Sequence, residues 1–183
     1  KFNFHLKFIY IVLNLFSYTG AFSVVAARSG ASVTSVDISG GVLSWAMDNF
    51  RHAGLDPEDH EFTTRDALSF LKVADRRNHV YDAILLDPPS FSESRRGGWV
   101  YKRDFPHLLR LSIGRLSSGG LLWAATNMRT LRPGTLEKWI GQAAAANRRR
   151  LDLLGVFGLP PDRPTPLSAP EERYLEVLCL RVD

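Results

Sequence analysis

Short apolar runs alternate along this chain with amphipathic stretches. Runs with the length and composition of buried strands lie at 9–16, 32–36, 61–64 and 81–86. Stretches with the apolar repeat of a helix lie between them, at 21–29, 40–53 and 67–75. Ser39 is placed to cap the second of these helices. The residues expected on its apolar face are Val42, Ala46, Phe50 and Ala53.

The second half of the chain closes differently. The elements expected there are a helix at 103–116, a turn at Gly119 and Gly120, a strand at 121–125 and a helix at 136–147. Strands at 151–157 and 174–182 then follow without a helix between them, which predicts an antiparallel hairpin. The loop at 159–172 holds five of the ten prolines and is expected to be stiff and irregular. The predicted fold is α/β, with a mostly parallel seven-stranded sheet that ends in this hairpin.

Length and composition set the broad class. The 183 residues suit one α/β domain spanning 1–183, in which 1–12 form an N-terminal extension of uncertain role. Apolar residues make up 45% and charged residues 23%, the balance of a globular protein. The net charge of +4 is too small to indicate a partner by itself. Because the chain starts at Lys1 and not at Met, we expect a fragment of a longer protein.

Cysteine and histidine usage argues against metal and disulfide chemistry. Cys179 stands alone, so no internal disulfide or thiolate cluster can form. The five histidines show no ligand spacing, and we expect no metal. The apolar run at 8–16 is too short to cross a membrane, which takes about 20 residues. A reducing cytoplasm is the expected compartment.

The first strand leads into a turn suited to a cofactor. Residues 14–22 read Asn14-Leu15-Phe16-Ser17-Tyr18-Thr19-Gly20-Ala21-Phe22. Gly20 allows a close backbone approach where a helix begins, and the amides there can hold a carboxylate. The three glycines that a dinucleotide site needs are not present, which disfavours NAD and FAD.

Acidic residues follow the next two strands. Asp37 can accept hydrogen bonds from both hydroxyls of a ribose, and Asp66 can accept one from an adenine amino group. Each acid also suits an ordinary helix cap. Together with Gly20, the two acids occur in the order that a nucleoside with an amino-acid tail requires.

The fourth strand ends in Asp87-Pro88-Pro89-Ser90-Phe91. The two prolines cannot continue the strand and stiffen a loop at the carboxyl edge of the sheet. The Asp87 carboxylate and the Pro88 carbonyl can accept hydrogen bonds from the edge of a flat base, while Phe91 stacks on it. A plain proline turn is the alternative interpretation.

Basic residues follow the same edge. The candidates for RNA contact are Arg95, Arg96, Lys102, Arg103, Arg129 and Arg132. Trp99, Tyr101 and Phe105 are interleaved with the first four. A solvated charged surface is the alternative. Residues 148–150, three further arginines, fall at the opposite end of the sheet and are expected to be solvated.

The motifs at 13–20 and 87–91 resemble those of bacterial large-subunit ribosomal RNA methyltransferases that modify cytosine C5 or guanine N7. The resemblance covers about 13–182, is specific in the first half and thins after Lys102. It implies a Rossmann-like class I methyltransferase fold, S-adenosylmethionine (SAM) as cofactor, ribosomal RNA as partner, and N-terminal RNA-binding PUA and linker domains that are absent here. The implied cofactor residues, with their neighbours in the motifs, are Asn14, Phe16, Tyr18, Thr19, Gly20, Asp37, Ile38, Asp66 and Ala67. Residues 87–91 would face the target base.

One departure from the family concerns the chemistry. Its cytosine enzymes use a cysteine after the fifth strand, where this chain has Asn127 within Ala-Ala-Thr-Asn-Met-Arg. Asn127 resembles the asparagine of the guanine-modifying members, and Cys179 is expected to pack in the core. A guanine nitrogen is therefore the favoured acceptor. A methyltransferase of small molecules or proteins, and an inactive SAM- and RNA-binding module, stay open as alternatives, as does the oligomeric state.

Overall fold

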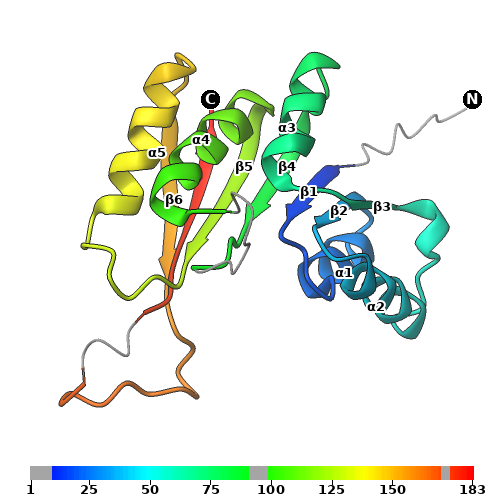
Figure 1. Ribbon diagram of the computed structural model, residues 1–183, viewed down its shortest axis with the longest axis horizontal. Helices are drawn as coiled ribbons and strands as arrows, with labels where there is room; N and C mark the ends of the chain where they lie inside the picture. Colours follow the sequence, from blue (N-terminus) through cyan, green and yellow to red (C-terminus); the bar gives the residue numbers. More distant parts are fainter. Residues whose placement is uncertain (1–9, 91–98, 170–173) are drawn as a thin grey trace, which may run out of the picture.

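The structure, a computed structural model, describes residues 10–90, 99–169 and 174–183. A seven-stranded sheet runs through them in the order β3-β2-β1-β4-β5-β7-β6 (Figure 1). Its strands are β1 (Ile11–Leu15), β2 (Ser32–Asp37), β3 (Glu61–Thr64), β4 (Tyr81–Leu86), β5 (Leu116–Thr126), β6 (Leu151–Phe157) and β7 (Glu176–Val182). Strand β7 pairs antiparallel with β5 and β6, and the other pairs are parallel. The predicted fold is confirmed.

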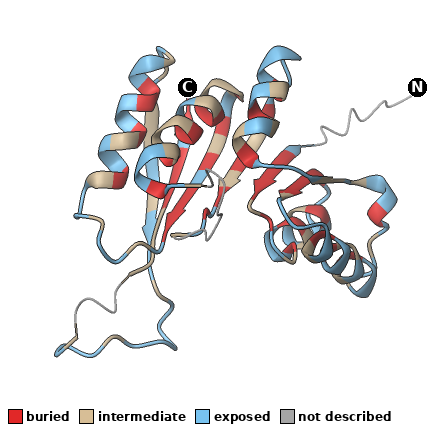
Figure 2. Ribbon diagram, in the orientation of Figure 1, coloured by how far each residue is buried: buried red, intermediate tan, exposed pale blue. Residues whose placement is uncertain are grey.

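Helices cover both faces of the sheet. They are α1 (Ala21–Arg28), α2 (Gly40–His52), α3 (Ala67–Arg76), α4 (Tyr101–Gly114) and α5 (Thr135–Ala146), with a short 3-10 helix at Pro57–Asp59. Helices α1 and α2 lie beside β1–β3, and α3, α4 and α5 lie on the other side (Figure 1). Figure 2 shows each of these helices buried along one side and exposed along the other. This amphipathic pattern is what the apolar repeats predict.

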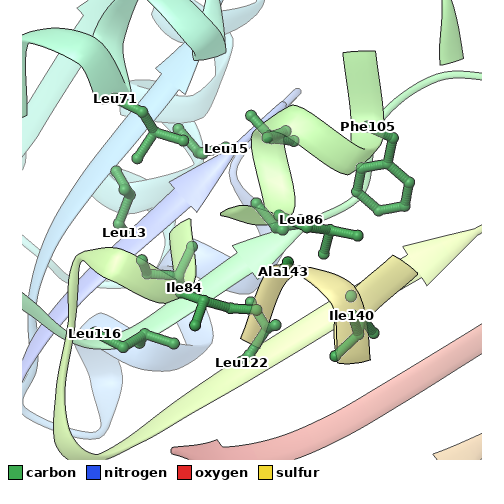
Figure 3. Packing of buried hydrophobic residues seen from close by; sticks show 14 of the residues in the cluster. Leu13, Leu15, Leu71, Ile84, Leu86, Phe105, Leu116, Leu122, Ile140 and Ala143 are labelled. Atoms are coloured by element: carbon green, nitrogen blue, oxygen red, sulfur yellow. The ribbon is translucent and has the colours of Figure 1, made fainter. Parts of the chain in front are cut away.

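The main core fills the space between the sheet and helices α3–α5. Leu13, Ile84 and Leu122 come from three neighbouring strands and are fully buried (Figure 3). Phe105 and Ile140 cover them from α4 and α5. A smaller core on the opposite face joins Val12, Ala27, Ala31, Val33 and Phe50. The two cores fix the central strands, whose carboxyl ends carry the candidate site.

The predicted apolar face of α2 is confirmed at Ala46 and Phe50 but not at its first residue. Ser39 caps the helix as expected, because its side chain accepts a hydrogen bond from the N–H of Val42. Leu43, not Val42, is buried together with Ala46 and Phe50. Leu43 precedes Ala46 by three positions, a spacing that satisfies the helical repeat as well as the four-residue spacing of Val42 does. The apolar pattern alone therefore did not decide between Val42 and Leu43 for the first turn.

The boundary between α4 and β5 also differs from the prediction. Helix α4 ends at Gly114, so Leu116 belongs to β5. Gly119 and Gly120 lie within β5 as part of an irregularity, where Tyr81 pairs with Leu116 but Ala83 pairs with Leu121. Gly119 has φ 78°, a conformation that favours glycine and lets the extra residues of β5 leave the pairing.

Arg149 has a structural role that the sequence did not indicate. Its guanidinium donates hydrogen bonds to the carbonyl oxygens of Leu116 at 3.2 Å and Asp183 at 2.6 Å. These contacts join the start of β5 to the residue after β7, and Arg149 itself lies in the connection between α5 and β6. The expectation that all three arginines at 148–150 are solvated is therefore wrong for Arg149.

The sheet face opposite α4 and α5 is apolar and exposed along β5 and β6. Trp123 and Phe157 stack there with ring centroids 5.4 Å apart. Phe22 and Leu85 lie beside them in a cavity of about 240 Å³. Phe22, Trp123 and Phe157 are all exposed, and α1 is the only helix of the described residues that contributes to this cavity.

A chain of buried hydrogen bonds joins β1, α1 and β2. Ser23, fully buried in α1, accepts hydrogen bonds from Asn14 Nδ2 at 2.9 Å and from Ser35 Oγ at 2.8 Å. Both donors are themselves buried. Because buried polar groups are costly when unpaired, these contacts hold α1 in one position against the two strands.

We expect Ser23→Ala to lower the free energy of unfolding by about 1–3 kcal/mol, since it leaves the Asn14 amide and the Ser35 hydroxyl without their acceptor. The exposed Ser44→Ala, which loses only a bond to the Gly40 carbonyl, serves as the control and should stay within about 0.5 kcal/mol. Urea denaturation followed by circular dichroism measures both. Equal losses in the two variants would contradict the structural role of Ser23.

Candidate active site

The turn between β1 and α1 is held in a strained conformation. Phe16 and Tyr18 have φ values of 59° and 47°, which cost non-glycine residues about 1–3 kcal/mol each. The Ser17 N–H donates to the Val36 carbonyl at 3.0 Å, and the Gly20 N–H donates to the Ser17 carbonyl at 2.9 Å. These bonds fix the turn beside the end of β2. Strain of this kind is concentrated at functional sites.

Gly20 is required by its conformation and by its packing. It precedes α1 with φ 76°, and a Cβ atom there would lie 2.9 Å from the Cβ of Ala46 in α2. The neighbouring Thr19 carbonyl accepts a hydrogen bond from Asn49 Nδ2 at 2.9 Å. Both residues therefore anchor the turn on α2.

The Asp37 carboxylate joins the turns that follow β1 and β2. Its Oδ2 accepts the N–H of Tyr18 and its Oδ1 accepts the N–H of Ser39, each at 3.0 Å. A carboxylate has about four acceptor positions, so two remain for a ligand. Asp37 is thus positioned by the backbone while it retains the capacity to bind hydroxyl groups.

Asp66 acts as the N-cap of α3. Its Oδ1 accepts the N–H of Ser69 at 2.8 Å, and its Oδ2 accepts no hydrogen bond from the described residues. The cap and the cofactor interpretations are therefore compatible, because one oxygen serves each.

These side chains surround a cavity of about 540 Å³ at the carboxyl edge of the sheet. The predicted cofactor residues that line it are Phe16, Tyr18, Asp37, Ile38, Asp66 and Ala67. Asn14, Thr19 and Gly20 do not line it, since their contacts go to Ser23 and to α2. From the predicted catalytic set, Asp87, Pro89 and Asn127 reach the same cavity.

Trp99 connects the cavity to the loop after β4. Its indole N–H donates to the Pro89 carbonyl at 3.0 Å, and its ring meets Phe16 edge-on with centroids 5.1 Å apart. The sequence indicated Trp99 only as one of three aromatics among basic residues. Tyr101 and Phe105, the other two, are buried in the core and do not face a partner.

Other cavity residues were not predicted from the sequence. Arg65 and Leu68 flank the predicted pair Asp66 and Ala67, and Lys72 follows Leu68 by one helical turn. Their proximity to Asp66 along α3 is the signal that could have found them. Arg103 was predicted as an RNA contact, yet it lines this cavity and pairs with Asp104 at 2.7 Å.

The loop after β4 presents acceptors to the cavity. Asp87 lies at its wall, and desolvation by the surrounding protein raises the pKa of its carboxyl above the ordinary value. Pro88 is buried, and the Ser90 hydroxyl donates to the Asn127 side-chain oxygen. The end of β4 is thereby joined to the end of β5.

The predicted basic residues divide into separate locations. Arg129 and Arg132 line a second cavity beside β5 and β7, and Lys102 is exposed on α4 outside both cavities. Phe91, Arg95 and Arg96 lie outside the described residues.

Cys179 lies in the middle of β7, paired with Trp123 of β5. It is buried, which confirms its expected packing role, and burial raises the pKa of its thiol. Within 10–90, 99–169 and 174–183, no three histidine, cysteine or acidic side chains gather as metal ligands would. No helix in those ranges has the length and apolar character needed to cross a bilayer.

The sequence matches the family described as S-adenosylmethionine-dependent methyltransferase over residues 9–165. This chain belongs to that family. Its cofactor is SAM, as the resemblance of its motifs implied. The methyltransferase is also similar to the crystal structure of SMU.776 in complex with SAH, with a TM-score of 0.82 and 30% identity over 94% of this chain and 45% of that chain.

Curated relatives are longer than this methyltransferase. YwbD of Bacillus subtilis is 34% identical over 171 residues, which are 93% of this chain and 43% of that protein. A relative from Neisseria meningitidis, named Ribosomal RNA large subunit methyltransferase K, is 40% identical over 121 residues, 64% of this chain and 34% of its own length. The chain therefore spans less than half the length of these relatives.

The donor set around the larger cavity fits SAM. Asp37 retains acceptor positions for ribose hydroxyls, and Asp66 Oδ2 can accept an adenine amino hydrogen. Phe16 and Ile38 line the cavity and give it apolar surface of the kind that an adenine ring requires. The cavity volume of about 540 Å³ is that of a small-molecule site.

We expect Asp37→Ala to weaken SAM binding about tenfold or more, because a hydrogen bond to a charged group contributes about 1.5–3 kcal/mol. Isothermal titration calorimetry measures the affinity, and circular dichroism checks the fold. Asp48→Ala, which removes an exposed carboxylate on α2, is the control and should bind SAM like the parent. Unchanged affinity in Asp37→Ala would refute the placement of the ribose.

A comparison of Gly20→Ala with Gly30→Ala separates the energetic cost of a positive φ from the cost of overpacking. Both glycines have positive φ, but a Cβ at Gly30 meets no atom within 4 Å. We expect Gly30→Ala to lose about 1–2 kcal/mol of unfolding free energy from its φ alone. Gly20→Ala should lose about 1–3 kcal/mol more from overpacking against Ala46. Similar losses of unfolding free energy in the two urea titrations would show that α2 accommodates the added Cβ, and the predicted overpacking against Ala46 would be wrong.

Proposed function

We propose that this chain transfers the methyl group of SAM to a base of ribosomal RNA, at a ring or exocyclic nitrogen, with guanine as the favoured base. The main support is the Asp-Pro-Pro-Ser loop, which Ser90 ties to Asn127 at the edge of the cofactor cavity. A flat base presented there meets acceptors from two strand ends at once. The name of the relative from Neisseria meningitidis, Ribosomal RNA large subunit methyltransferase K, supports the same substrate class.

The assignment to nitrogen rests on the position of the chain's one cysteine, which is not among the residues that line the cavity. Methylation at C5 of cytosine requires a thiolate that attacks C6. Cys179, the only cysteine, is buried on β7, where it pairs with Trp123 of β5. Burial raises the pKa of its thiol, which favours the unreactive protonated form. A nitrogen lone pair needs no covalent activation, only alignment.

The chain's own residues then have the task of orienting the base. SAM supplies an electrophilic methyl group when bound. Asp87 accepts a hydrogen bond from an amino or imino group of the base, and the Pro88 carbonyl offers a second acceptor. Asn127, positioned by Ser90, reads the neighbouring edge. Trp99 holds the loop in place through the Pro89 carbonyl.

We also propose that the chain is the catalytic domain of a longer protein with further RNA-binding domains. The relatives are more than twice as long as the matched part. The exposed aromatic face around Trp123 and Phe157 offers a surface against which such a part could pack.

The decisive experiment incubates the protein with SAM and RNA containing 5-fluorocytosine, which traps C5 enzymes as a covalent adduct. We expect no adduct, together with methylation of ordinary ribosomal RNA, and Cys179→Ala should retain this activity with a modest loss of stability. An adduct that disappears in Cys179→Ala would refute the nitrogen assignment. Transfer to small acceptors without transfer to RNA would refute the substrate class.

Asp87→Ala should abolish methyl transfer while SAM affinity stays near that of the parent, because Asp87 is assigned to the base and not to the cofactor. The carboxylate form is the acceptor, so activity in the parent should fall as pH decreases through the Asp87 pKa. Since desolvation raises that pKa, the loss should begin at a higher pH than for an ordinary aspartate. A rate profile that is flat across the acidic range would contradict this role.

A further inference from the structure

Two arginines from separate segments converge on one tyrosine ring at the hairpin end of the sheet. Arg129 follows β5, whereas Arg163 belongs to the long connection between β6 and β7. Their guanidinium carbons lie 5.1 Å and 5.7 Å from the centre of the Tyr174 ring. The ring thus holds both cations near one another through cation–π contacts.

These cations have no anionic partner among the described residues. Neither Arg129 nor Arg163 forms an ion pair there, whereas Arg103, Arg115 and Arg149 each do. Asp162 is adjacent in the chain and Glu176 lines the neighbouring cavity, yet neither carboxylate bonds to the two arginines. Like charges held close together repel, and a bound anion would relieve that repulsion.

The surface beside the ring is hollowed. A cavity of about 180 Å³ is lined by Arg129, Leu159, Arg163, Pro164, Thr165 and Tyr174. A second, of about 510 Å³, shares Arg129 and Tyr174 and adds Arg132. It extends to Thr126 and Met128, which flank Asn127 of the candidate active site. The surface that carries Arg129, Arg132 and Arg163 therefore extends to Asn127, where the base is proposed to bind.

The chain holds Arg163 in a defined position. The Arg163 N–H donates to the Pro160 carbonyl at 2.9 Å, and Pro161 lies within this turn while Pro164 follows it. Prolines restrict the backbone of this loop, so less backbone entropy is lost when the loop binds a ligand. Figure 1 shows the connection, in orange, projecting beyond the end of the sheet.

We propose that Arg129 and Arg163, with Tyr174 as their support, form a subsite for a phosphodiester of the RNA strand that delivers the target base. Two guanidinium groups can each donate paired hydrogen bonds to phosphate oxygens. Tyr174 fixes the spacing of the two arginines. This inference rests on the proposed RNA substrate and adds Arg163 and Tyr174 to the RNA-contacting residues.

The test compares Arg163→Gln with Arg148→Gln in the full chain. Arg148 is exposed at the opposite edge of the sheet, so its replacement removes the same charge away from the subsite. Fluorescence anisotropy with a labelled ribosomal RNA fragment gives the affinity between 50 and 300 mM KCl. Counterion release predicts that each lost phosphate contact flattens the salt slope by about 0.7–0.9 and weakens binding roughly five- to eightfold at 0.1 M salt.

We expect this flattening in Arg163→Gln and in Arg129→Gln, but not in Arg148→Gln. Arg163→Lys keeps the charge and should retain the slope. Tyr174→Leu should weaken binding while the slope changes by less than in either arginine variant. SAM affinity should equal that of the parent in Arg163→Gln, which checks that the variant is folded.

The possible failures are distinct. If the parent binds RNA and the slope is the same in Arg163→Gln and Arg148→Gln, the subsite is wrong while the proposed function stands. If the parent methylates small acceptors and its RNA binding does not depend on salt, the proposed function is wrong and the subsite is overturned with it.

Discussion

The Asp37 carboxylate is the contact on which the cofactor side of the molecule depends. It accepts one N–H from the turn after β1 and one from the turn after β2, and so joins two loops that share no other side-chain hydrogen bond among the described residues. The positive φ values of Phe16 and Tyr18 persist because this anchor and the Ser17–Val36 bond restrain the turn. Because Asp37 organises this turn and is also the residue expected to bind the ribose, one substitution there should change both SAM affinity and local order.

A second set of contacts performs the same task on the substrate side. Trp99 bonds to the Pro89 carbonyl and touches Phe16, so the loop after β4 is fixed against the cofactor turn. Ser90 bonds to Asn127 and fixes that loop against the end of β5. Methyl transfer needs two reactants in line, and misplacement of either by about 1 Å is costly. Rigid strands that end together at one edge of the sheet supply that alignment.

The sequence predicted the strands and the acidic positions well, because both depend on local patterns. Strands are short local patterns, and Asp37, Asp66 and Asp87 lie at or just after the ends of β2, β3 and β4. Residues within a motif were harder to assign. Asn14, Thr19 and Gly20 adjoin Phe16 and Tyr18 in the chain, yet they bond to or pack against α1 and α2. The direction in which each residue of a turn faces depends on the helices that pack against the turn, and a local sequence pattern does not show these contacts. Tyr101 and Phe105 alternate with basic residues in the sequence yet are buried in the core, since composition does not distinguish a core aromatic from an exposed one.

The irregularity in β5 has a consequence for how the sheet tolerates changes in chain length. The extra residues around Gly119 leave the pairing at the amino end of the strand, and from Ala83 and Leu121 onward β4 and β5 run in continuous register. Insertions or deletions near Gly119 are therefore absorbed before the register resumes, and Asp87 keeps its position opposite the end of β5. A change in chain length at the amino end of β5 would therefore leave the geometry at the carboxyl end of the strand as it is.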